Sequence, residues 1–289
     1  MTYQVLVSTM NQNNSHKFEE MNLSSDAIIV NQGENDSVIS IQKGKYELKF
    51  YSFNERGVGL SRNTAMMRAQ ADIIQFADDD MIFTDTYRED VINEFKSHPE
   101  ADAILFSIES LNPERPLLKI ERFRRVRKIE ALKYGCARLA IRREKVIYNN
   151  LSFSLLFGGG ALYGSGEDTL FLQDCIRSGI KIYKSPVKVA DVRQDSSTWF
   201  SGYNEKYYRD KGALFAAALP NLCYSYALIN AIKSKSSNHR KLQIFQLYVC
   251  GIKEYKKKKK GKKTGTVKYR MKTAIKWTQE PSRTIARSE

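Results

Sequence analysis

Three consecutive carboxylates are the most chemically suggestive feature of the chain. Asp78, Asp79 and Asp80 directly follow Ile73–Ala77, an apolar run that predicts a buried β-strand. In open α/β folds, ligands bind at the carboxyl edge of the sheet, where such a triplet would lie. Carboxylates packed together need a cation or hydrogen-bond donors, and an all-oxygen set suits Mg²⁺ or Mn²⁺. A solvated turn or helix cap is the alternative interpretation of the triplet alone.

A helix start that contains glycine and arginine precedes the triplet, at Arg56–Asn63. Backbone N–H groups at a helix N-terminus favour phosphate, and arginine adds a planar fork of donors. The spacing matches neither a Walker loop nor the dinucleotide fingerprint, and glycines there also serve simple tight turns. We predict a helix from Gly57 whose apolar stripe has helical spacing, at Leu60, Thr64, Met67 and Ala71.

A second acidic pair, Glu167-Asp168, follows a glycine-rich segment about 90 residues further on. Glycines allow a substrate to approach the backbone closely, and the helix that begins here favours an ionised carboxylate at its N-terminus. An aspartate with the ordinary pKa of about 3.9 is charged at pH 7, so it can accept a proton from an attacking hydroxyl. The alternative is an acidic pair that only stabilises the helix.

The elements that must position these residues alternate between short apolar strands and helices. This alternation is typical of parallel strands joined by crossover helices, so we predict an α/β fold with a mostly parallel central sheet. Strands are expected at Gln4–Ser8, Ala27–Val30, Ile73–Ala77 and Ala103–Ile108, and helices from Gly57, over 85–96 and from Glu167.

The order of these features resembles the family-2 glycosyltransferases of the GT-A fold over about residues 3–215. Phe157–Phe171 and Ser196–Gly202 are most similar to bacterial members that build capsular or other surface polysaccharides. The resemblance implies a Rossmann-like GT-A domain over 1–232, followed by a C-terminal helical extension and basic tail over 233–289. Within the domain, a nucleotide-sugar half is expected over about 1–110 and an acceptor half over about 111–232.

The resemblance also implies a reaction and a donor site. The enzyme would transfer a hexose-type sugar from a UDP-sugar to a saccharide acceptor, which we expect to be lipid-linked, with inversion in a single displacement. Thr9 and Asn31 lie at the loops that hold the nucleobase in such enzymes. Arg62 matches the helix arginine that faces the diphosphate, and Asp78 and Asp79 would contact the ribose and phosphates.

For catalysis and the acceptor, the resemblance assigns Asp168 as the general base and Asp80 as the ligand of Mg²⁺ or Mn²⁺. Acceptor contacts are expected from four residues: Gly159, Gly160, Glu167 and Trp199. The alternative for Trp199 is a position in the core.

Two stretches depart from the family pattern. Many relatives place an acidic residue in the loop after the second strand, where this chain has Asn31-Gln32, so the uracil contact lacks that residue. Many also carry a histidine after the catalytic helix that joins the metal or diphosphate, whereas Val192–Ser196 contain none. Gln194, Asp195 or water is left as the third metal ligand.

Positive charge is concentrated at the end of the chain. Residues 1–232 hold 29 basic and 29 acidic residues, whereas residues 233–289 hold 18 and 3, so the net charge of +15 lies in the second segment. The lysine block Lys256–Lys260 would stay solvated or meet an anionic surface. We expect a cytoplasmic protein peripherally attached to the inner face of the cell membrane. A disordered tail that only aids solubility is the alternative.

Gly212–Ile232 carries no charged residue for 21 positions, which is long enough to span a bilayer, although Pro220 and Asn221 favour a buried or interfacial helix. A nucleic-acid-binding protein that grips phosphates with its tail is a rival function, but the neutral body argues against it, and we expect no nucleic-acid partner. A metal-dependent nucleotidyltransferase is the other rival, and it would not need the Gly-Glu-Asp helix.

Overall fold

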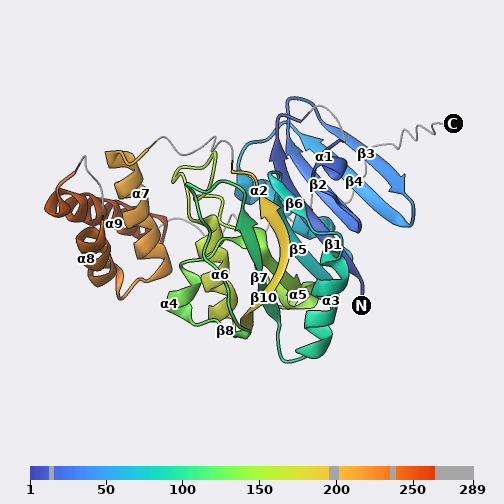
Figure 1. Cartoon of the computed structure of the whole chain (residues 1–289). Helices are drawn as coiled ribbons and strands as arrows, with labels where there is room; N and C mark the ends of the chain where they lie inside the picture. Colours follow the sequence, from blue (N-terminus) through green and yellow to red (C-terminus); the bar gives the residue numbers. More distant parts are fainter. Residues whose placement is uncertain (13–15, 195–201, 235–238, 264–289) are drawn as a thin grey trace.

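The computed structural model describes residues 1–12, 16–194, 202–234 and 239–263, and within them one ten-stranded sheet runs through the molecule (Figure 1). The strands are β1 Tyr3–Met10, β2 Asp26–Gln32, β3 Ser37–Lys43, β4 Tyr46–Phe53, β5 Ile73–Asp78, β6 Met81–Phe83, β7 Ala103–Ser110, β8 Arg124–Arg125, β9 Leu139–Arg142 and β10 Ile182–Val192. They lie in the order β3-β4-β2-β1-β5-β9-β7-β10-β6, and β8 pairs with β10.

Most of the sheet runs in one direction. Strands β4, β2, β1 and β5 pair in parallel in that order, and β7 is parallel to β10. Strand β9 lies between β5 and β7 and is antiparallel to both, so β5 and β7 point the same way. The predicted α/β fold with a mostly parallel sheet is therefore confirmed. The carboxyl ends of six strands meet at one edge, which is where such folds bind ligands.

Helices cover both faces of the sheet, as the apolar strands require. They are α1 Lys17–Glu20, α2 Val58–Arg68, α3 Tyr87–Ser97, α4 Lys128–Ala131, α5 Arg143–Tyr148 and α6 Glu167–Arg177. One hydrophobic cluster joins the sheet to α1 and α3 through residues such as Phe18 and Phe95. A second cluster joins the opposite face to α2, α5 and α6, with Met66 and Phe171 among its members. The result is a three-layer domain.

A group of three helices lies at the end of the molecule opposite the β3–β4 hairpin (Figure 1). It comprises α7 Glu205–Ala218, α8 Cys223–Lys233 and α9 Lys241–Lys263, which share a hydrophobic cluster. Helices α7 and α9 cross at glycines, because a Cβ on Gly212 would lie 2.1 Å from the Tyr248 carbonyl oxygen and one on Gly251 would lie 1.9 Å from that of Arg209. The predicted boundary between 1–232 and 233–289 therefore falls inside a packed unit.

The uncharged stretch Gly212–Ile232 is divided between two helices. It covers the second half of α7, which ends at Ala218, and most of α8, which begins at Cys223, with Pro220 between them. No helix within the described ranges has the length and apolar composition that crossing a bilayer requires.

The predicted apolar stripe of α2 is partly wrong. Thr64 is buried as predicted, but Met67 is 65% exposed and Ala71 lies beyond the end of the helix. The buried face also carries Ala65, Met66 and Arg62. The helix is rotated relative to the prediction because the Arg62 guanidinium points inward, toward carboxylates at the edge of the sheet.

Candidate active site

A cavity of about 1130 Å³ opens at the carboxyl edge of the sheet. The ends of β1, β5 and β10 contribute to its lining, as do the start of α2 and the first turn of α6. The sequence-predicted residues that line it are Thr9, Arg62, Asp78, Asp79, Asp80, Gly159, Gly160 and Asp168. The structure thus brings together the acidic triplet and the second acidic pair, which are about 90 residues apart in the chain.

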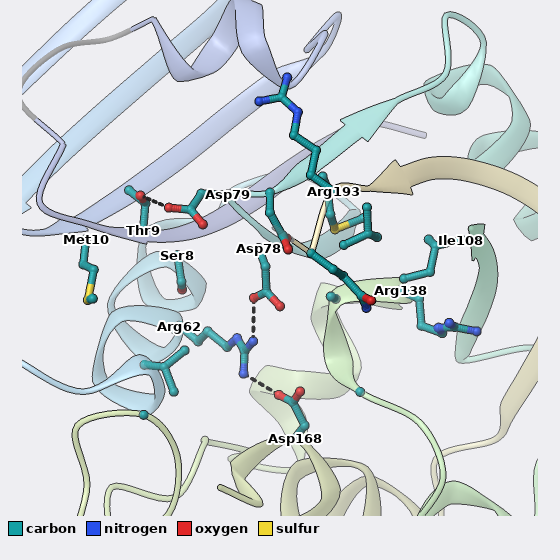
Figure 2. Close-up of a pocket in the computed structure, with 18 of the residues that line it drawn as sticks. Ser8, Thr9, Met10, Arg62, Asp78, Asp79, Ile108, Arg138, Asp168 and Arg193 are labelled. Carbon is teal, nitrogen blue, oxygen red and sulfur yellow. Dashed lines mark hydrogen bonds and ion pairs between the residues drawn. The ribbon is translucent and has the colours of Figure 1, made fainter. Parts of the chain in front are cut away.

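Arg62 links these two acidic regions (Figure 2). Its Nη2 donates to Asp78 Oδ1 at 2.7 Å, and its Nη1 donates to Glu167 Oε1 at 2.9 Å and also to Asp168 Oδ1. The Arg62 side chain is only 4% exposed, and the Phe153 ring lies 5.4 Å from its guanidinium carbon. The buried guanidinium therefore fixes the start of α6 against the end of β5.

The Asp168 carboxyl is largely buried beside one cation and two other carboxylates. Burial raises its pKa to about 7, with Arg62 opposing the rise and the carboxylates of Glu167 and Asp78 adding to it. The side chain keeps 23% of its surface exposed, so it can still reach a substrate in the cavity. A carboxyl that titrates near pH 7 is well matched to general base catalysis.

The other two carboxylates of the triplet differ in their contacts. The Thr9 hydroxyl donates to Asp79 Oδ2, which joins the ends of β1 and β5. Asp80 has no such cationic or hydroxyl partner among the described side chains, and burial together with Asp78 and Asp79 raises its pKa to about 6. The backbone N–H of Gln194 donates to the Asp80 carboxyl and partly offsets this rise.

The cavity offers a hard divalent cation one available carboxylate but no closed set of protein ligands among the described residues. Among the described residues, no group of three or more acidic, histidine or cysteine side chains converges as a closed metal cage. Asp78 and Asp79 are engaged by Arg62 and Thr9, which leaves Asp80 as the carboxylate free for a cation. One carboxylate fits Mg²⁺, which in phosphate-transferring sites is held by few protein ligands, substrate phosphates and water. Gln194 lines the same cavity, whereas Asp195 lies outside the described residues.

Two predicted contact residues lie away from the cavity. Asn31 is 1% exposed, and its side-chain amide makes hydrogen bonds with the backbone of Gln12 and with Ser52 Oγ. Asn31 therefore holds the loop in shape instead of lining the cavity. Its neighbour Gln32 lines the cavity. Glu167 is 5% exposed and faces Arg62, so the structure places it behind the site.

The glycine-rich segment serves close packing within the chain. The Gly159 carbonyl accepts from the Val58 N–H at 3.1 Å, at the start of α2. Gly160 has φ +80°, and a Cβ there would lie 3.2 Å from the Gly57 nitrogen. These contacts press the segment against α2, while both predicted glycines still line the cavity. Trp199 lies outside the described residues.

Arginines that the sequence analysis did not single out also line the cavity. Arg138 is 5% exposed, donates to the Leu118 carbonyl at 3.1 Å, and has a pKa lowered by burial. It directly precedes β9, whose antiparallel direction brings its first residues to the same edge as the carboxyl ends of the parallel strands. The signal in the sequence was an arginine before the apolar run Leu139–Ile141. Arg193 and Arg115 complete this basic wall.

Comparison with known proteins matches this architecture. The model of the family described as glycosyl transferase family 2 matches residues 6–151. The structure of residues 1–349 of S. aureus TarS in complex with UDP-GlcNAc is 16% identical, with a TM-score of 0.56 over 88% of this chain and 73% of that chain. The corresponding complex with UDP is 15% identical, with a TM-score of 0.56 over 92% of each chain. At these identities the structural likeness establishes the GT-A fold alone.

Comparison with curated protein sequences found no match. The family match spans half of the chain and contains the α2 arginine and the acidic triplet. The chain therefore belongs to glycosyl transferase family 2 and is a glycosyltransferase.

Proposed function

We propose that the enzyme transfers a sugar from a UDP-linked donor to a hydroxyl of a saccharide acceptor, with inversion, in the synthesis of a bacterial surface polysaccharide such as a capsule. The observation that carries this proposal is the Arg62 bridge, which holds Asp78 and Asp168 in one cavity. The structurally similar TarS was solved with UDP-GlcNAc and with UDP, which supports a UDP-linked donor for this chain as well.

The proposed chemistry is a single displacement. The acceptor oxygen bonds to the anomeric carbon of the sugar while the bond from that carbon to the diphosphate oxygen breaks. The hydroxyl proton passes to the Asp168 carboxylate, and the nucleoside diphosphate departs with the bonding electrons. A positioned base of this kind contributes roughly 10²–10⁴-fold to the rate. Arg62 orients Asp168 through Nη1, and Asp78 and Asp79, which line the same cavity, would contact the ribose and phosphates of the donor.

We propose that Asp80 holds Mg²⁺ or Mn²⁺ together with the donor diphosphate. When bound, such a cation neutralises charge that develops on the departing diphosphate. Burial, followed by the neighbouring carboxylates of Asp78 and Asp79, raises the pKa of Asp80, and a bound cation would supply the counter-charge that favours its ionised form. Arg138 and Arg193 line the same cavity and supply further positive charge to the phosphates.

A panel of nucleotide sugars tests the reaction. With Mg²⁺ or Mn²⁺ present, we expect release of UDP from a UDP-sugar, faster with acceptor than without. Asp168→Asn should lower turnover by roughly 10²–10⁴-fold with little change in donor affinity. Asp174→Asn is the matched control, because Asp174 lies on the same helix and pairs with Arg177 at the surface. Absence of nucleotide release from every donor in the panel would refute the proposal.

We further propose that the acceptor is lipid-linked and that the enzyme docks on an anionic membrane surface from the cytoplasm. Helix α8 supports this, because it buries Cys223, Ala227 and Ala231 and turns a different set of large side chains outward. That outer face carries Tyr224, Leu228, Ile229 and Ile232, which are 42–55% exposed. The basic end of α9 adjoins it, with Lys256 Nζ 4.7 Å from the centre of the Tyr224 ring.

An apolar face beside lysines suits the interfacial region of an anionic bilayer, where each nearby lysine contributes about 1 kcal/mol. Co-sedimentation with anionic and neutral vesicles tests this. Leu228→Ser with Ile232→Ser should weaken binding, whereas Ile147→Ser should not, since Ile147 is 61% exposed but lies on α5. Salt should weaken binding to anionic vesicles. Equal, salt-independent binding to both vesicle types would exclude the electrostatic part.

A further inference from the structure

A second cavity, of about 220 Å³, lies where the catalytic helix α6 meets the three C-terminal helices. Thr169 of α6, Lys211 of α7, Asn230 of α8 and Tyr248 of α9 all line it. It shares no described lining residue with the active-site cavity. Thr169 directly follows Asp168, however, so the second cavity adjoins the same first turn of α6 that carries the proposed base.

Lys211 is a partly buried cation that lacks an ion pair. No carboxylate oxygen of a described residue lies within 4.0 Å of its Nζ, and its ammonium group makes no hydrogen bond to them. Burial lowers its pKa, although Glu167 and Asp210 oppose this effect from a greater distance. The centre of the Tyr207 ring lies 5.6 Å from Lys211 Nζ. An uncompensated charge in such a place is costly unless a ligand neutralises it.

The two nearby carboxylates are already engaged by other groups. Glu167 Oε1 accepts from Arg62, and its Oε2 accepts from the Gly166 N–H at 3.1 Å. Asp210 Oδ2 accepts from the Gly164 N–H at 2.9 Å and from Lys206 Nζ at 2.5 Å. The arrangement therefore leaves Lys211 as the member of this region whose charge is not balanced by the described residues.

Thr169, Tyr226 and Tyr248 also line the cavity, and their hydroxyl groups make no hydrogen bond to described residues. Burial raises the pKa of Tyr248, so its hydroxyl stays protonated and can donate. Asn230 is held in place by the hydrogen bond from its Nδ2 to the Tyr226 carbonyl at 2.8 Å. One ammonium and three hydroxyls offer donors to the several oxygens of a phosphate group.

We propose that this second cavity is a phosphate-binding subsite that positions a phosphate-bearing acceptor relative to Asp168. The assignment to the acceptor rests on the proposed function, whereas phosphate binding itself does not. Leu214 lines the second cavity and packs against Gly166, the residue that precedes α6. A phosphate held by Lys211 would therefore sit against the segment that places the base.

Lysine footprinting of the full chain tests the proposal. Saturating UDP and Mg²⁺ occupy the donor cavity, and potassium chloride keeps the ionic strength constant. The acetylation rates of Lys211 and Lys96 are then followed by peptide mass spectrometry as inorganic phosphate is added. Lys96 is the internal control, because it is exposed at the end of α3, far along the chain from the cavity.

We expect the Lys211 rate to fall roughly tenfold at a phosphate concentration ten times the dissociation constant, with the Lys96 rate unchanged. Acetate at the same concentration should give no such protection. Protection by inorganic phosphate supports the site, and protection only by vesicles containing phosphatidic acid supports it with a lipid headgroup as the source. Equal protection by acetate, or no protection in either phosphate arm, overturns the proposal.

A variant provides a second readout. Phosphate should raise the melting temperature of the wild type and of Lys96→Met but not of Lys211→Met. Without phosphate, Lys211→Met should melt no lower than the wild type, since removal of an unpaired buried charge does not destabilise. A marked loss of stability would instead make Lys211 a structural residue. Release of UDP from donor is measured on the same samples, so that failure of the transferase proposal is separable from failure of the phosphate site.

Discussion

Replacement of Arg62 by methionine removes the one cation that three carboxylates share. Methionine keeps the length and the apolar stem of the side chain, so the packing against Phe153 is largely retained. Asp78, Glu167 and Asp168 then face one another without a counter-charge. Two consequences follow, one for the stability of the fold and one for the protonation state of Asp168, the proposed base.

The loss of stability can be bounded from the geometry. Glu167 and Arg62 side chains are 6% and 4% exposed, and removal of one partner from such a buried pair costs about 3–5 kcal/mol. In a chain of this size that lowers the melting temperature by roughly 10 °C. Asp78 is 40% exposed, so solvent screens its pair with Arg62 and it contributes little to this loss. The loss should shrink as the pH falls, because unpaired carboxylates take up protons.

The second consequence of Arg62→Met is a higher pKa for Asp168. A unit positive charge about 4 Å away lowers the free energy of an ionised carboxylate by about 4 kcal/mol at the polarity typical near a protein surface, or about 3 pKa units. Arg62 lies closer than this to Asp168, whose pKa is about 7 with Arg62 in place. In Arg62→Met we therefore expect the acidic limb of kcat/KM to move upward by about 2–3 pH units.

The assay is kcat/KM for UDP release from about pH 5.5 to about pH 10.5, which covers the acidic limb of both the wild type and the variant. Arg68→Met is the matched control, because Arg68 lies on the same helix and its guanidinium stacks 4.9 Å from the Tyr51 ring, outside the cavity. The control should keep the wild-type pH profile. If Arg62→Met loses activity by a constant factor at every pH, Arg62 does not set the pKa of Asp168 and the reasoning fails.

Three further outcomes follow from the site. For the wild type, kcat/KM should fall tenfold per pH unit below about 7, the pKa of Asp168. Asp168→Asn should have a higher melting temperature than the wild type, by a margin that grows from about pH 4 to 7. The reason is that the carboxyl ionises more readily in the unfolded chain than in the fold, which destabilises the wild type over this range. Asp80→Asn should abolish stimulation of UDP release by Mn²⁺ in a metal titration. Gly135→Ala should lower kcat with little change in melting temperature, because its Cβ would lie 3.1 Å from Asp168 Oδ2.

The sequence predicted the residues that end strands better than those that surround them. Asp78 ends β5 and Thr9 lies near the end of β1, so a correct parallel sheet places both at the cavity. The register of β1 with β5 brings Ser8 opposite Asp78, and the triplet follows from there. These placements depend only on strand direction and period, which the apolar pattern carries.

Side-chain direction at the end of a strand was harder to predict. Asn31 lies opposite Thr9 on the neighbouring strand, near the same edge of the sheet. Its side-chain amide nevertheless bonds to the Gln12 backbone and does not face the cavity. Glu167 precedes Asp168 by one residue, which on a helix turns its side chain by about 100° and sends it to Arg62 instead of the cavity. Neither choice is encoded in local periodicity, because each depends on a partner distant in the chain.

The β3–β4 hairpin and β9 were absent from the prediction for a different reason. The hairpin strand Ser37–Lys43 is mostly exposed, so it lacks the apolar run that marks a buried strand. Strand β9 has only four residues and is inserted antiparallel between β5 and β7, which the βα alternation does not anticipate. Its insertion places Arg138 at the active-site edge, and so this arginine was missed together with the strand.

Arg62 has to meet two opposing demands. A base must be ionised to accept a proton, and burial among the carboxylates of Glu167 and Asp78 disfavours the ionised form of Asp168. A dedicated, unshared arginine would ionise Asp168 fully but would depress its basicity, and with it the rate of proton transfer. Burial raises the pKa of Asp168 to about 7, and Arg62, which divides its guanidinium among three carboxylates, offsets that rise only in part. If Asp168 is the base, as proposed, Glu167 affects catalysis through Arg62 without touching the acceptor. Glu167→Gln should give Asp168 a larger share of Arg62, lower the midpoint of the kcat/KM profile, and reduce the plateau rate above it. A profile that moves upward in this variant would contradict the shared-arginine argument.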